Sequence, residues 1–87
     1  MERVLLAVPE YQRGWIETLP LHHSQRMVEE HEDYSVFEYK MRIMPDFCRA
    51  ILYNGLDIQV LEPQSLRQEM AVIAEELDRI YNPEYFE

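Results

Sequence analysis

Residues 54–66 read NGLDIQVLEPQSL and combine a helix end, a strand and a helix start in close succession. Gly55 can adopt the left-handed conformation that ends many helices, because it has no Cβ atom. Ile58 and Val60 alternate with polar residues, which is the pattern of a half-buried strand. Pro63 favours the first turn of a helix. The stretch therefore predicts that the chain leaves one helix, crosses a sheet and enters its last helix.

Upstream of this stretch, two extended segments over residues 25–31 and 34–43 flank the polar pair Glu32-Asp33, which predicts a β-hairpin. The first segment is polar, as expected of an edge strand that charge protects from further pairing. The second segment alternates between an apolar face of Phe37, Tyr39, Met41 and Ile43 and a charged face of Glu38, Lys40 and Arg42.

The first strand is predicted over residues 3–8, which are apolar on both faces after Arg3. Such a strand is central and is covered on both sides, or it lies at an interface. A helix follows from Pro9, in which Tyr11, Trp15 and Leu19 form an apolar stripe with Ile16 beside it. We therefore expect a structural role in the core for Trp15, whereas an exposed tryptophan would mark an interface.

Two further helices are predicted. Pro45 begins the first of them, and its inward residues are Phe47, Ala50 and Ile51. The last helix has a capping-box pattern at Ser65 and Gln68 and is expected to end at Asn82-Pro83, before a short tail over residues 84–87. Its apolar stripe comprises Leu66, Met70, Ile73, Leu77 and Ile80.

The resulting order of elements is strand, helix, strand, strand, helix, strand, helix. It predicts an α+β domain with a ferredoxin-like split βαββαβ sheet and an additional C-terminal helix, because β-α-β crossovers are right-handed. The first and third strands should be central, since they are the most apolar. Residues 1–87 are expected to form a single domain, because a chain of 87 residues supports one core. Gly55 and Pro63 are assigned structural roles.

The composition narrows the classes of function. A net charge of −9, from 17 acidic and 8 basic residues, repels phosphate backbones and disfavours a general nucleic-acid binder. The single cysteine, Cys48, cannot form an internal disulfide, and no signal-peptide pattern begins the chain, so a cytoplasmic location is expected. No apolar run is long enough to cross a membrane.

No residue pattern indicates catalysis or a cofactor. The spacing of His22, His23, His31 and Cys48 matches no common zinc pattern, so no metal is expected. Ser24 lies near histidines but lacks an elbow motif and an orienting acid, which favours a structural role at the start of the hairpin. We expect no enzyme.

A small cationic patch is a second possibility for function, formed by Arg26, Lys40 and Arg42 if the strands bring them together. Scattered surface charges with acidic neighbours explain the same residues equally well. Together with His23 and Gln25, these three residues are the candidates for ligand or interface contacts.

The sequence also resembles the C-terminal extension domain (WCX) of WYL-domain transcriptional regulators over about Arg3 to Tyr81. The residues that carry the resemblance are His23-Ser24-Gln25, Gly55, Ile58-Gln59-Val60-Leu61-Glu62-Pro63, Ser65-Leu66-Arg67 and Tyr81. The resemblance implies that the chain is the C-terminal fragment of a longer bacterial regulator. The preceding parts would be a winged helix that binds promoter DNA and a WYL domain of Sm-like fold, neither of which is encoded in these residues.

In that family, the domain is expected to help the regulator to form a homodimer and to line the cleft where the WYL domain senses a ligand, which in several members is single-stranded nucleic acid. DNA would be bound only through the absent domains, and the net charge favours the dimerisation role over direct nucleic-acid contact. The alternative is a ferredoxin-like small-molecule sensor with a pocket between the sheet and the last helix.

Overall fold

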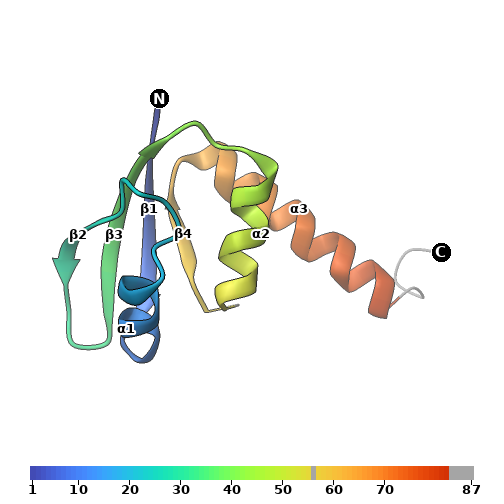
Figure 1. Cartoon of the computed structure of the whole chain (residues 1–87). Helices are drawn as coiled ribbons and strands as arrows, with labels where there is room; N and C mark the ends of the chain where they lie inside the picture. Colours follow the sequence, from blue (N-terminus) through green and yellow to red (C-terminus); the bar gives the residue numbers. More distant parts are fainter. Residues whose placement is uncertain (56, 83–87) are drawn as a thin grey trace.

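The computed structural model describes residues 1–55 and 57–82. Four strands form one antiparallel sheet in the order β2-β3-β1-β4 (Figure 1). Their bounds are Glu2–Pro9 for β1, Arg26–Glu30 for β2, Tyr34–Met41 for β3 and Gln59–Glu62 for β4. The predicted α+β class is confirmed, and so is the prediction that the first and third strands are central.

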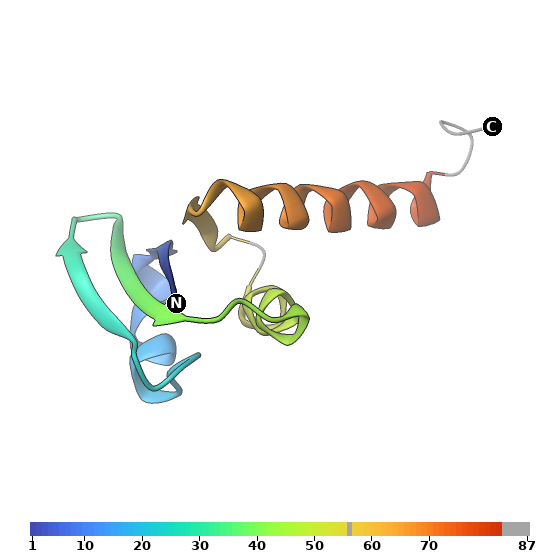
Figure 2. The same ribbon diagram turned by 90° about the horizontal axis from the view of Figure 1, so that it is seen from above.

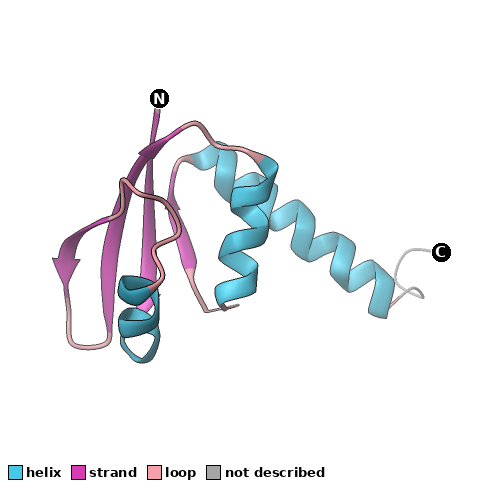
Figure 3. Cartoon of the chain, in the orientation of Figure 1, coloured by secondary structure: helices cyan, strands magenta, loops and turns pink. Residues whose placement is uncertain are grey.

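Three helices accompany the sheet: α1 over Glu10–Thr18, α2 over Pro45–Asn54 and α3 over Gln64–Tyr81. Figures 2 and 3 show that α1 and α2 lie on the same side of the layer of strands, whereas α3 runs outward past the β4 edge. None of these helices is long and apolar enough to cross a membrane.

The core lies between the sheet and the helices α1 and α2. Val4, Leu6 and Val8 of β1 point into it and are fully buried, as expected from the alternation of side chains along a strand. The other buried apolar members are Ile16, Phe37, Tyr39, Met41, Phe47, Cys48, Ile51, Ile58, Val60 and Leu66. The predicted inward faces of β3 and of α2 are therefore confirmed at most positions, although Ala50 is only half-buried.

The hairpin is confirmed. β2 pairs only with β3 among the described strands, and every one of its residues is exposed, as predicted for a charged edge strand. The register shifts between Met27 and Glu29, which is a β-bulge that strengthens the local twist. His31 donates its backbone N–H to the carbonyl of Tyr34 over 2.8 Å and closes the turn.

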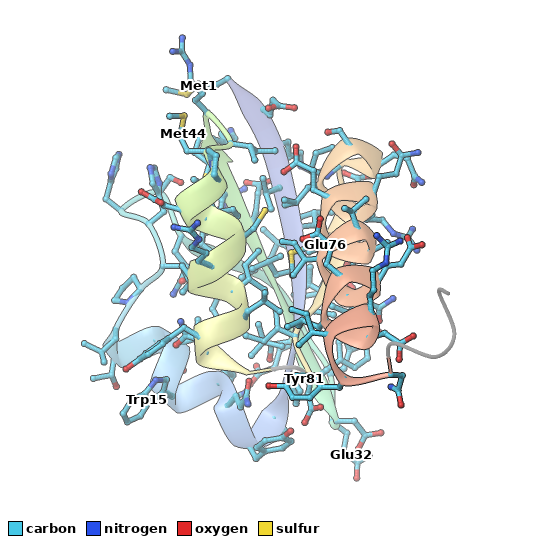
Figure 4. The ribbon with its side chains drawn as sticks, turned by 90° about the vertical axis from the view of Figure 1, so that its right-hand side faces the viewer. Met1, Trp15, Glu32, Met44, Glu76 and Tyr81 are labelled. Atoms are coloured by element: carbon cyan, nitrogen blue, oxygen red, sulfur yellow. The ribbon has the colours of Figure 1, made fainter. Side chains whose placement is uncertain are left out.

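The prediction for α1 was wrong about which face is buried. Ile16 is fully buried, whereas Trp15 is 59% exposed and Tyr11 and Leu19 are also exposed. Figure 4 shows Trp15 on the outer side of the helix. A nine-residue helix buries only a narrow stripe against the sheet. Because Ile16 occupies that stripe, the aromatic residues on the neighbouring positions point outward.

The junction at residues 54–66 has the predicted elements, with different details at both helix ends. Gly55 ends α2 and donates its N–H to the carbonyls of Ile51 and Leu52. Its φ of 152° and ψ of 143° are an extended conformation with positive φ, which side chains rarely allow, and not the left-handed helical conformation that we predicted. Leu56, within the same stretch, lies outside the described residues.

At the start of α3, Pro63 is the residue before the first helical turn, and the peptide bond that precedes it is cis. The carbonyl of Pro63 accepts hydrogen bonds from the N–H groups of Leu66 and Arg67, both at 3.1 Å. The predicted capping box at Ser65 and Gln68 was wrong, because no side chain caps this helix.

The apolar stripe of α3 is only partly buried. Leu66 is 1% exposed, and Met70 and Ile73 pack at the edge of the core. Beyond them the stripe faces solvent, with Leu77 exposed and Ile80 67% exposed. The helix ends at Tyr81, near the predicted stop, while Pro83 and the tail over residues 84–87 lie outside the described residues.

Candidate functional site

Glu38 is the centre of a charged cluster on the side of the sheet opposite to α1 and α2. Its carboxylate accepts a hydrogen bond of 2.7 Å from Nε of Arg3 and one of 2.9 Å from Arg26. Arg3 also contacts Glu62 at 3.4 Å. The cluster thus joins all four strands, because these residues belong to β1, β2, β3 and β4.

The geometry of the cluster shifts the ionisation of its members. The hydrogen bond from Arg3 and the one from Arg26 hold the pKa of Glu38 below its usual value of 4.5, against the opposing effect of burial. The same hydrogen bond raises the pKa of Arg3. Glu38 is only 6% exposed, so its charge is largely shielded from solvent by the two guanidinium groups.

Two of the residues in the predicted cationic patch, Arg26 and Lys40, lie at this end of the sheet. Arg26 is engaged by Glu38, and Lys40 stands opposite Arg3 in the β1–β3 register. Arg42 is exposed just after the end of β3. Sequence reasoning missed Arg3, although its alternation with Leu5 along β1 was a signal that it shares this face.

Gln25, a candidate ligand contact, makes hydrogen bonds within the fold. Its Oε1 accepts from the hydroxyl of Tyr39 at 2.7 Å and from the N–H of Leu21 at 3.2 Å. Its Nε2 donates to the carbonyl of Ile16 over 3.0 Å. The side-chain amide therefore joins β3, α1 and the connector between α1 and β2.

Ser24 has the structural role that the sequence predicts. Its hydroxyl accepts a hydrogen bond of 3.0 Å from the backbone N–H of Lys40 and lies 2.8 Å from Nδ1 of His22. The N–H of Ser24 also donates to that Nδ1 over 3.1 Å, so the nitrogen acts as an acceptor. His23 is exposed, and its ring lies 4.1 Å from the ring of His22 between centroids.

A groove of about 630 Å³ separates α2 from α3. It is lined by apolar residues of both helices, including Leu52, Val72 and Ile73, with Cys48 and Glu69 in its wall. The thiol of Cys48 lies 3.5 Å from the carboxylate of Glu69. Burial, followed by this contact with Glu69, raises the pKa of the Cys48 thiol.

A second cavity, of about 480 Å³, lies on the other flank of α3, between that helix and β4. Ile58 and Val60 form its floor, and Met70, Ala74 and Leu77 line it from α3. It occupies the position at which the sequence predicts a ligand pocket in the alternative function. With its size and apolar lining, it is of the kind that holds small organic molecules.

The exposed aromatic residues of α1 form a third surface feature. Tyr11 and Trp15 line a shallow hollow with Tyr53 from the end of α2. The hydroxyl of Tyr11 donates a hydrogen bond to the carboxylate of Asp57. Exposed aromatic side chains are enriched at interfaces, so this hollow belongs with the groove and the cavity as candidate contact surface.

The comparison with known families gives one match. The sequence model of the WCX domain family matches residues 2–77, which is most of the chain and includes all four strands. No curated protein sequence matches the chain closely enough to count as a relative.

Proposed function

Since the chain belongs to the WCX domain family, the C-terminal extension of WYL-domain regulators, we propose that it is a non-enzymatic regulatory and dimerisation domain of a bacterial transcriptional regulator. In this role it couples ligand sensing by the WYL domain to DNA binding by the winged helix. The regulator acts in the cytoplasm, where its DNA target lies. The proposed partners are the WYL and winged-helix domains of the same regulator and a second copy of this domain.

The observation that carries the proposal is the exposed half of the apolar stripe of α3. Leu77 and Ile80 continue the spacing of Leu66 and Ile73 but are 43% and 67% exposed. The apolar stripe of a helix in a water-soluble protein usually packs against another element. Tyr81, at the last turn, extends the same exposed surface (Figure 4). We propose that the WYL domain of the regulator contacts this part of α3.

The test of this coupling uses the full-length regulator. Leu77→Glu should leave the isolated domain folded, because Leu77 is exposed there, and should weaken the contact with the WYL domain. The expected results are faster hydrogen exchange in α3 and a changed affinity for promoter DNA. Leu77→Met is the matched control, because it keeps an apolar side chain of similar volume. Identical exchange and DNA binding in all three proteins would contradict the coupling role.

A single-stranded nucleic-acid effector is part of the proposal, with the contact made mainly by the WYL domain. The net charge of −9 supports this division, because it repels phosphates. Mixing the isolated domain with single-stranded DNA at low salt should give no tight complex. Tight, salt-sensitive binding by the isolated domain would place the effector site in it.

A second candidate function is small-molecule sensing by the cavity between β4 and α3. Its apolar lining and its volume of about 480 Å³, which lies in the range of small-molecule sites, support this function. A panel of metabolites tested by thermal shift should then include a compound that raises the melting temperature. Ala74→Trp fills the cavity and should abolish that rise, whereas Ala50→Ser, outside the cavity, should not.

We further propose that the fold is the ferredoxin-like split β-α-β type with an additional helix. Support comes from the two central strands, β1 and β3, and from α1 and α2 on one side of the sheet. The candidate contacts of this domain within the regulator remain His23, Arg26, Lys40 and Arg42, all of which are exposed.

A further inference from the structure

The side of the sheet opposite to α1 and α2, here called the open face, has an apolar centre. Leu5 and Ala7 of β1 point to this side, because they alternate with the core residues. Val36 stands opposite Ala7 in the register and, at 2% exposed, lies beneath the surface of this centre, whereas Leu5, Ala7 and Leu61 are half-buried and form its accessible part. Leu61 of β4 lies with Ala7 and Val36 around a hollow of about 380 Å³. None of the three described helices lies across this centre (Figure 2).

One end of the open face is basic. The β1–β3 register places Arg3 opposite Lys40, and the β2–β3 register places Arg26 opposite Glu38. Three cations therefore face two carboxylates, Glu38 and Glu62, at this end. Both arginines are more than half exposed, so their charge reaches the surface although Glu38 is bound between them.

The other end is acidic. Glu29, Asp33 and Asp57 surround the hollow next to Ala7 and Val36, and no lysine or arginine lines it. The carboxylate of Glu29 contacts His31, and that of Asp57 accepts from Tyr11, but neither contact brings a lysine or arginine to this end. The open face is thus positive at one end of the strands and negative at the other, with an apolar centre between them.

We propose that two copies of this chain pair face to face through the open face, about a two-fold axis that lies in the interface at right angles to the strands. This operation turns the second sheet end over end. It places the basic end of each copy on the acidic end of the other and brings the two apolar centres together. In that arrangement Arg26 approaches Glu29 of the second copy, and Lys40 approaches Asp33.

The charges also select this orientation against its alternative. A two-fold axis parallel to the strands would place both basic ends together and both acidic ends together, and like charges in contact disfavour an interface. Sheets that pack face to face keep their strands nearly aligned, which agrees with the proposed axis. The pairing rests on the homodimer of the proposed function and specifies its surface.

Charge reversal at each end tests the pairing. Lys40→Glu gives the basic end an excess of carboxylates, and Asp33→Lys leaves the acidic end with two carboxylates and one ammonium group in place of three carboxylates. The fold uses only the backbone of these two residues in its hydrogen bonds, to Ser24 and Glu10 respectively, so both variants should fold, as circular dichroism can verify. Each variant alone should dimerise about tenfold more weakly than the wild type by analytical ultracentrifugation at low salt.

The decisive measurement mixes the two variants. In a mixed pair, the two substituted positions meet at one end of the interface with opposite charges, and Lys40 meets Asp33 at the other end, so a one-to-one mixture should form a heterodimer about as tight as the wild-type homodimer. The double variant Lys40→Glu/Asp33→Lys should likewise dimerise with itself. About 0.5 M NaCl should weaken the mixed pair, because salt screens exposed charges.

Two results would overturn the pairing, and each is distinct from failure of the proposed function. If neither charge variant changes the dimer while Leu77→Glu dissociates it, the copies pair through α3, and the homodimer stands without the open face. If the wild-type domain stays monomeric up to about 1 mM, copies of this domain do not pair through the open face. The coupling role would then still be decided by hydrogen exchange and DNA binding of the full-length regulator.

Discussion

The hydroxyl of Tyr39 donates a hydrogen bond of 2.7 Å to Oε1 of Gln25. Tyr39 is fully buried in the centre of β3, and its burial strongly raises the pKa of the phenol, so it stays a neutral donor. Through Gln25 the strand is joined to the carbonyl of Ile16 in α1 and to the N–H of Leu21.

Removing either partner of the Tyr39–Gln25 hydrogen bond should lower the free energy of unfolding, but by different amounts. Tyr39→Phe removes one hydrogen bond and should lower the free energy of unfolding by about 1 kcal/mol. Gln25→Ala should cost more, about 2–3 kcal/mol, because it leaves three polar partners without the side-chain amide. Urea unfolding of both variants provides the measurement. A Gln25→Ala variant as stable as Tyr39→Phe would show that the amide does not join the three elements.

The lowered pKa of Glu38 predicts that part of the stability of the domain is lost at acid pH. Its pKa is lower in the folded state than the ordinary value of 4.5, so the unfolded state binds more protons as the pH falls below that value. The contribution of Glu38 is complete above about pH 4.5 and is lost as the pH falls through the folded-state pKa. Glu38→Gln should therefore show a smaller loss of melting temperature between pH 7 and pH 3 than the wild type.

Glu62→Gln is the control for that measurement. Glu62 contacts the same Arg3 but is half exposed, and exposed ion pairs contribute little to stability. The melting temperature of Glu62→Gln should fall between pH 7 and pH 3 by as much as that of the wild type. If Glu62→Gln reduced the loss of melting temperature as much as Glu38→Gln, the reduction would come from the changed net charge of the domain and not from the ion pairs of Glu38.

The two glycines predict opposite effects of an added side chain. At Gly55 a Cβ atom would clash with the side-chain amide of Gln12, and the φ of 152° is strained for any other residue. Gly55→Val should cost about 2–3 kcal/mol by chemical unfolding with circular dichroism, chiefly through the backbone. Gly14→Ala meets nothing within 4 Å inside α1 and should stabilise the domain by about 0.5–1 kcal/mol.

A second variant separates the two causes at Gly55. Because Gln12 is a flexible side chain, Gln12→Ala should relieve the steric contact and leave the backbone strain. Gly55→Val should remain destabilising in that background. Full recovery of stability would mean that the positive φ carries no cost, contrary to the role we assign to this residue.

Side chains on the apolar stripe of α3 become more exposed from Leu66 to Leu77. The loss of stability caused by substitution with alanine should therefore decrease in the same direction. Leu66→Ala should lower the free energy of unfolding by about 2–5 kcal/mol, because Leu66 is 1% exposed and belongs to the core. Leu77→Ala should cost less than about 1 kcal/mol in the isolated domain, because its side chain is already exposed. Equal costs from urea unfolding would indicate that a further element covers the end of α3 in solution.

Cys48 is predicted to react slowly with thiol reagents at neutral pH. Its thiol is buried and its pKa is raised, so the reactive thiolate is scarcer than in a free cysteine. Glu69→Gln removes one cause of that shift and should speed the reaction, while burial still limits it. An unfolded sample in urea gives the reference rate, and a native rate equal to it would show that α3 opens freely from α2.

Patterns that depend on neighbours in sequence predicted the fold well. Alternation predicted the buried face of β3, which includes Phe37, and the apolar character of β1 and β3 predicted that both strands are central. The helix stripe failed for α1, because three large residues at helical spacing outweighed a single Ile16 beside them. In α3 the periodicity identified an apolar face correctly but could not show that the described fold covers only half of it.

The charged and polar contacts were harder to predict, because they join residues far apart in sequence. The alternation of β3 places Glu38 on the polar face, which predicts exposure, yet two arginines from β1 and β2 cover it. Gln25 was a candidate for ligand contact because it lies in a stretch that carries the family resemblance, and its partners Tyr39 and Ile16 are known only from the tertiary arrangement. For the second apolar face of β1, the sequence left open whether another element covers it or it lies at an interface, and none of the described helices lies across it.

The attachment of α3 at one end has a geometrical consequence. From the buried Leu66 to the exposed Tyr81 the helix extends about 22 Å, at about 1.5 Å per residue. A rotation of about 10° about Leu66 would therefore move Tyr81 by about 4 Å, which is the scale of one atomic contact. A rotation of about 10° at the β4 end of the helix is therefore enough to make or break contacts at its far end.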